Sequence, residues 1–103
     1  MKHIRQDVWD KWFPPYVINQ NEGNGMIDYL NLKNSYIAAI QMGLMLNAGY
    51  EEAKRGNDLL HKFCENCIDN SNYNESDKQN MKHDLELVKE VLSREIGCHY
   101  KGV

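Results

Sequence analysis

The stretch MKHDLELVKEVLSREI, residues 81–96, decides the fold class of this chain. Five of its apolar residues recur at steps of four, three, four and four, at Met81, Leu85, Val88, Leu92 and Ile96. Because an α-helix turns once in about 3.6 residues, this spacing lays them along one face, with the charged residues between them pointing elsewhere. The pattern predicts an amphipathic helix that packs against at least one other helix.

Both ends of this helix are marked in the sequence. Ser76 and Gln79 have the spacing of a capping box, in which each side chain bonds the backbone N–H of the other residue. Gly97 is the residue type that usually ends a helix through a left-handed turn. The sequence therefore predicts a helix over about residues 76–96.

A second helix is predicted over about residues 50–69. Glu51 and Glu52 fall in its first turn, where the helix dipole favours anions. The run from Asp69 to Asn74 is rich in turn-forming residues, so we expect the last two helices to form an antiparallel hairpin. The apolar residues share one face: Tyr50, Ala53, Leu60, Phe63, Cys64 and Cys67.

A third helix is predicted over about residues 28–48, with Asn34 and Ser35 as an alternative start. Its apolar stripe consists of Leu30, Ile37, Ile40 and Leu44. Residues 19–25 have the composition of a loop, and an aromatic arm, 1–18, is expected to hold one short helix stopped by Pro14 and Pro15. The expected architecture is a single all-α domain, 1–103, built as a small bundle of three principal helices plus the short N-terminal one.

Composition limits the classes of function. The net charge of -3 offers no basic field for a phosphate backbone, so nucleic acid is not an expected partner. No apolar stretch is long enough to cross a membrane, and no apolar leader follows Met1. Three cysteines, an odd number, favour a reducing cytoplasm over a secreted disulfide scaffold. The abundance of asparagine and lysine is typical of AT-rich coding sequence and indicates a phage or a low-GC bacterium as the source.

The segment HKFCENC, residues 61–67, combines a histidine with the C-x-x-C spacing of zinc and redox sites. Redox chemistry is disfavoured, because the motif approaches a helix C-terminus, where the dipole raises a thiol pKa. Folding the last two helices about residue 72 sets His61 opposite His83 or its neighbours, which allows a zinc cluster of His61, Cys64 and His83, with Cys67 as a fourth ligand if the helix end unwinds. The favoured interpretation is that Cys64 and Cys67 are small buried hydrophobes, and no cofactor or metal is predicted.

The segment REIGCHY, residues 94–100, separates Arg94 from His99 by four residues. This spacing resembles the R-x-x-x-x-H signature of the HEPN ribonucleases, a family of helical domains. The resemblance implies that Arg94 and His99 act on RNA phosphate at a dimer interface. The competing interpretation makes Arg94 a partner of the helix dipole and His99 a solvated residue.

With no stronger catalytic motif, the leading hypothesis is a non-catalytic protein-binding module, a small inhibitor, immunity or regulatory protein that occludes a partner protein. Aromatic residues gather in the N-terminal arm, and aromatic side chains dominate binding energy in interfaces. Self-association through a leftover apolar helix face is a further expectation. The predicted partner-binding residues are the aromatic anchors Trp9, Trp12, Phe13 and Tyr16 and the acidic residues Asp7, Asp10, Glu51 and Glu52.

Overall fold

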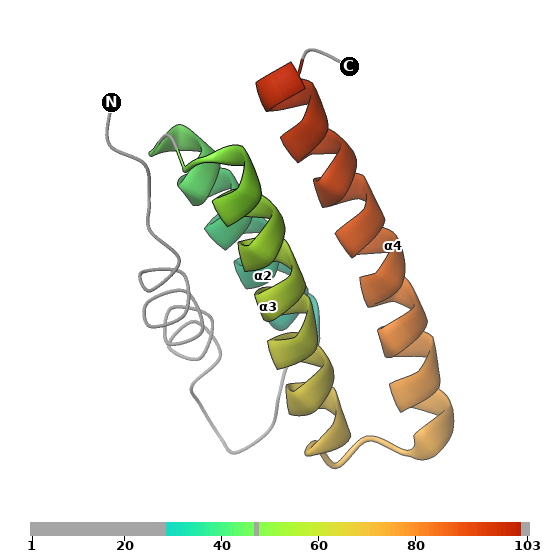
Figure 1. Ribbon diagram of the computed structural model, residues 1–103. Helices are drawn as coiled ribbons and strands as arrows, with labels where there is room; N and C mark the ends of the chain where they lie inside the picture. Colours follow the sequence, from blue (N-terminus) through green and yellow to red (C-terminus); the bar gives the residue numbers. More distant parts are fainter. Residues whose placement is uncertain (1–28, 47, 102–103) are drawn as a thin grey trace.

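In the described part of the chain, three α-helices follow one another in an antiparallel, up-down-up order (Figure 1). The computed structural model describes residues 29–46 and 48–101. Within them α2 covers Tyr29–Met45, α3 covers Tyr50–Asp69 and α4 covers Glu75–Lys101. The predicted all-α class and the three principal helices are confirmed, whereas the arm 1–18, its short helix and the loop 19–25 lie outside the described residues. No described helix combines the length and the apolar character needed to span a membrane.

Helix α3 packs against both of its neighbours, most extensively against α4, and α2 and α4 share a smaller contact. The stripe predicted for α4 is confirmed, because its last four members are buried and Met81 is packed against the core. Each fully buried leucine or isoleucine stabilises the fold by about 1.5–3 kcal/mol. The largest fully buried side chains are Tyr36, Leu32, Ile40, Leu60, Ile68, Leu85, Leu92, Ile96 and Cys64.

The buried face of α2 is rotated from the predicted one. Leu30 is 65% exposed, and Ile37 and Leu44 are only half-buried. The actual core face carries small residues at four-residue steps, Ser35, Ala39 and Gly43, beside the larger buried residues Leu32, Tyr36 and Ile40. Small side chains let the backbones approach closely, so this face, rather than the one with more leucine, is turned toward the bundle.

Helix α4 begins at Glu75, and the predicted cap at Ser76 is wrong. Asn74 is the cap: the backbone N–H of Asp77 donates to Asn74 Oδ1 over 2.8 Å. The backbone N–H of Lys78 donates to the Asn74 carbonyl over 2.9 Å, which closes the first turn. Ser76 lies inside that turn.

The predicted helix end at Gly97 is also wrong, because α4 continues to Lys101. The last turn packs on the start of α3: the rings of Tyr100 and Tyr50 meet edge to face with centroids 6.0 Å apart. The Lys101 ammonium lies 4.4 Å from the centroid of the Tyr50 ring. These contacts between distant segments hold the helix together across the glycine.

One buried polar residue joins all three helices. Asn57 of α3 accepts a short hydrogen bond from the Tyr36 hydroxyl of α2 and donates from Nδ2 to the Lys89 carbonyl of α4 over 3.1 Å. Both Asn57 and Tyr36 are buried. Because a buried amide is costly unless it is hydrogen-bonded, this network favours one relative placement of the helices.

Candidate functional sites

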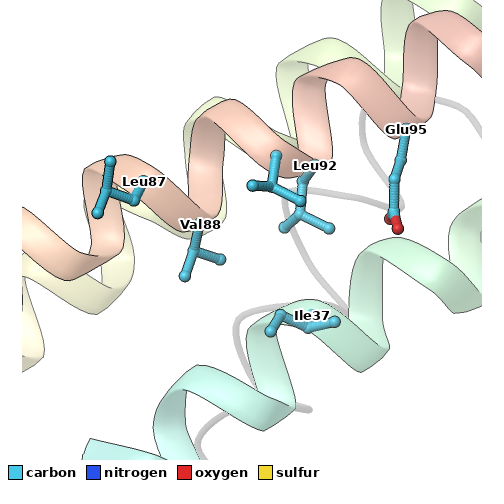
Figure 2. Close-up of a pocket in the computed structure, with 6 residues that line it drawn as sticks. Ile37, Leu87, Val88, Leu92 and Glu95 are labelled. Atoms are coloured by element: carbon cyan, nitrogen blue, oxygen red, sulfur yellow. The ribbon is translucent and has the colours of Figure 1, made fainter.

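An apolar groove of about 300 Å³ lies between α2 and α4. Figure 2 shows Val88 and Leu92 of α4 pointing toward Ile37 of α2. Of the described residues, Leu87 and Val91 complete the apolar lining, and Glu95 supplies the one charged side chain. A concave apolar surface with a single charged group can accept apolar side chains and orient them through that charge.

Leu87 and Val91 are 50% and 53% exposed. They are four residues apart on α4 and therefore lie on the same side of the helix, beside its core stripe. The sequence analysis did not identify Leu87 and Val91 as site residues. The pattern that could have identified them is a second pair of apolar residues, each one position before a residue of the core stripe, Val88 or Leu92. Exposed leucine and valine next to an apolar groove are typical of interaction surfaces.

A cluster of three polar side chains, Tyr29, Lys33 and Asp84, lies next to the groove. Its members come from α2 and α4, the two helices that form the groove. Tyr29 of α2 donates a short hydrogen bond to Asp84 of α4, and the Lys33 ammonium lies 3.0 Å from the same carboxylate. The hydrogen bond from Tyr29, with help from Lys33, lowers the pKa of Asp84. Since Lys33 and Asp84 each precede a groove residue, Ile37 and Val88, by four positions, this cluster bounds the groove on that side.

The motif HKFCENC lies within the unbroken helix α3. Cys64 is fully buried, and burial raises the pKa of its thiol to about 12. Cys67 is half-buried, and burial raises its pKa as well. A thiol that stays protonated at neutral pH is a poor nucleophile. Cys64 is a fully buried core residue, as the favoured interpretation predicts.

His61 faces Glu86, and the prediction that it lies opposite His83 is wrong. Its Nε2 atom is 3.2 Å from Glu86 Oε1, and its Nδ1 atom is 3.4 Å from Glu65 Oε1. The same alignment of α3 with α4 places the Lys89 ammonium 3.1 Å from the Asp58 carboxylate. Each residue of α3 therefore faces a residue of α4 that is about three positions, nearly one turn, later than a fold centred on residue 72 predicts. His83 is exposed, and the structure does not bring it together with His61 and Cys64.

The described residues contain one group of three side chains with metal-ligand spacing. It consists of His61, Glu65 and Glu86, whose ligand atoms all lie within 4.8 Å of one another. The two glutamates were not singled out in the sequence, because Glu86 reaches His61 only through the register of the α3–α4 hairpin.

Arg94 and His99 are both exposed on α4. Residues five positions apart on a helix point in directions about 140° apart, so the two side chains diverge within one chain. The Arg94 guanidinium is paired with Glu90 over 2.7 Å, and the His99 ring lies against Tyr100 with centroids 4.7 Å apart. The ribonuclease interpretation stays a prediction.

Most of the predicted partner-binding residues lie outside the described part of the chain. These are Asp7, Trp9, Asp10, Trp12, Phe13 and Tyr16. Glu51 and Glu52 stand in the first turn of α3 as predicted, with Glu51 exposed and Glu52 half-buried. The Glu52 carboxylate folds back over Gly49 so closely that a Cβ there would collide with it. Of this pair, Glu51 is the more accessible to a partner.

Comparison with protein-family models, curated proteins and solved structures finds no match for this chain. Its function therefore has to be inferred from its own residues.

Proposed function

We propose that this chain is a non-catalytic protein-binding module that receives the apolar face of a partner's amphipathic helix in the groove between α2 and α4. The observation that carries the proposal is the half-exposed pair Leu87 and Val91 beside the groove. Helix-in-groove recognition uses apolar anchors three, four and seven residues apart, which suits an elongated apolar surface between two helices.

The charge of the groove specifies the chemistry of the partner. Glu95 is the only charged residue that lines it in the described part of the chain, and the whole chain carries a net charge of -3. A basic residue flanking the apolar anchors of the partner helix would pair with Glu95, and a basic partner would be attracted over a longer range. The expected occupant is thus an amphipathic helix with two or three apolar anchors and at least one lysine or arginine beside them.

This proposal keeps the wider hypothesis of a small cytoplasmic inhibitor, immunity or regulatory protein from a phage or a low-GC bacterium, which acts by occluding its partner. In that hypothesis Trp9, Trp12 and the other aromatic anchors of the arm would add a second contact. The groove allows a more specific experiment than the arm, because the structure describes its lining residues, their exposure and the charged side chain of Glu95.

Photocrosslinking tests the proposal. A photoreactive amino acid at position 91 is compared with the same group at position 62, an exposed lysine on α3 that does not line the groove. In host lysate, position 91 should capture a protein that position 62 does not. The crosslinked segment should be an amphipathic helix with a basic flank, and the purified partner should bind Val91→Asp at least about tenfold more weakly than Lys62→Ala.

Three outcomes would contradict the proposal. Crosslinks from position 91 to a second copy of this chain would make the groove a self-association surface. Crosslinks to residues 1–28 of the same chain would make it an internal packing site. A captured partner that binds Val91→Asp and the wild type equally well would show that the groove does not contribute to recognition.

A further inference from the structure

His61 is buried in the seam between α3 and α4 with a carboxylate on each side of its ring. It is only 4% exposed, whereas the side chains of Glu65 and Glu86 are 31% and 59% exposed. Glu65 follows His61 by one turn on α3, and Glu86 reaches the ring from α4. A buried imidazole thus lies between two partly exposed carboxylates, one from each helix.

The Nε2 atom of His61 finds no hydrogen-bond partner among the described residues, although it is buried and lies close to Glu86. The Glu86 oxygen is within ion-pair distance at 3.2 Å but not in the direction that a hydrogen bond from this nitrogen requires. Buried polar atoms are normally satisfied, and an unsatisfied one requires a physical explanation. A metal ion beside Nε2 would provide the missing partner.

The spacing of the three groups suits a small divalent ion. Nitrogen and oxygen ligands lie about 2.0–2.2 Å from Zn²⁺, so neighbouring ligands in a tetrahedral site are roughly 3.3 Å apart. The Nε2 atom and the Glu86 oxygen already have this separation. Glu65 lies 3.4 Å from the other ring nitrogen, Nδ1, and one ligand atom from each of the three residues lies within 4.8 Å of the other two. Zn²⁺ binding would therefore draw the Glu65 carboxylate, on a side chain that is 31% exposed, toward Nε2.

We propose that His61, Glu65 and Glu86 bind a divalent transition-metal ion of the Zn²⁺ class at the α3–α4 seam. One imidazole and two carboxylates give the site two negative charges, which match those of the ion. The imidazole favours a transition metal over Ca²⁺ or Mg²⁺, which prefer oxygen ligands alone. Zinc sites with three protein ligands commonly hold a water molecule in the fourth position.

This site is independent of the proposed partner groove. At about 100° per residue around the axis of α4, the Glu86 side chain leaves the helix about 120° away from the mean direction of the Leu87 and Val91 side chains. A metal ion here would tie α3 to α4 at the level of His61 without touching the groove lining.

Zinc titration of the full chain, followed by calorimetry, tests the site. The decisive comparison is Glu86→Gln against Glu90→Gln, since both remove one charge from an exposed glutamate on α4, but Glu90 is paired with Arg94 outside the cluster. We expect the wild type and Glu90→Gln to bind one Zn²⁺ with similar affinity. Glu86→Gln and Glu65→Gln should each weaken binding at least about tenfold, since even outer-shell changes at metal sites commonly cost this much.

A stability readout accompanies the titration. Zn²⁺ at about ten times the wild-type Kd should raise the Tm of the wild type and of Glu90→Gln by several degrees and raise the Tm of Glu86→Gln by clearly less, because a ligand that binds only the folded state stabilises it in proportion to how far the site is filled. The exposed His83 provides a second control, as His83→Ala should behave like the wild type. Two results would overturn the proposal. One is that the wild-type protein binds no Zn²⁺ at about 100 µM, a concentration that detects even weak sites. The other is that Glu86→Gln binds Zn²⁺ as tightly as Glu90→Gln.

Discussion

Two tyrosine-to-phenylalanine substitutions should have different effects on stability, one destabilising and the other neutral or stabilising. Tyr36 and Tyr100 both place a hydroxyl out of contact with solvent, but only the Tyr36 hydroxyl has a partner, namely Asn57. The Tyr100 hydroxyl finds no hydrogen-bond partner among the described residues. The same chemical change, loss of one oxygen atom, therefore has different physical consequences at the two positions.

The magnitude for Tyr36→Phe follows from what is left behind. The ring stays in place, so no large cavity opens, but the Oδ1 atom of the buried Asn57 loses its donor. Leaving a buried acceptor unsatisfied costs about 1–3 kcal/mol, so we expect the free energy of unfolding to fall by about 1–2 kcal/mol. For a domain of this size, each kcal/mol corresponds to roughly 4–8 °C in Tm.

Tyr100→Phe removes a hydroxyl whose burial is uncompensated. We expect this variant to be neutral or more stable than the wild type by up to about 1 kcal/mol, since the desolvation cost disappears and the contact with the Tyr50 ring is kept. Urea unfolding at pH 7, followed by circular dichroism, measures both values with one assay. A loss below about 0.3 kcal/mol for Tyr36→Phe, or an equal loss for both variants, would refute the hydrogen-bond reasoning.

Three further predictions concern α4 and the cysteines. Gly97→Ala should raise the free energy of unfolding by about 0.5–1 kcal/mol in urea melts, because Gly97 is helical and an added Cβ meets no atom within 4 Å; destabilisation would show that the helix ends there. With a thiol reagent at pH 8, the exposed Cys98 should react rapidly and the buried Cys64 only after unfolding. The Cys64 thiol, with its pKa raised from 9.0 to about 12, contributes stability that is complete below pH 9 and is lost as the pH rises from there toward 12. Ionisation of Cys64 should lower the free energy of unfolding by about 1.4 kcal/mol per pH unit in this range. In urea melts between pH 9 and 11, Cys64→Ala should therefore lose less stability per pH unit than the wild type by this amount.

Local periodicity predicted the core of α4, but the ends of the helix depended on choices that periodicity does not decide. Asn74 and Ser76 are both good capping residues, and each has a polar residue three positions later, Asp77 and Gln79. Gly97 carries a real tendency to end a helix, but the packing of Tyr100 on Tyr50 outweighs it. That contact joins residues fifty positions apart, so a local pattern cannot reveal it.

The side-chain clusters were harder to predict than the fold for a related reason. The sequence marked His61 as a candidate ligand but placed it opposite His83 instead of Glu86, because the register of a hairpin depends on how the connecting residues fold. A difference of three residues, nearly one turn, exchanges one facing side chain for another. Asn57 gave no local signal at all, since its role appears only when Tyr36 and Lys89 arrive from the other two helices.

The groove follows from the width of the apolar surface on α4. At about 100° per residue, the core stripe occupies an arc of about 80°, and Leu87 and Val91 extend the apolar surface to about 180°. A helix that packs in a bundle needs an apolar face of about 100° or slightly more. Helices α2 and α3 cover the core stripe and leave Leu87 and Val91 half-exposed. The surface of α4 is therefore wide enough for one more helix, and this excess is the physical reason to expect a helical partner at the groove.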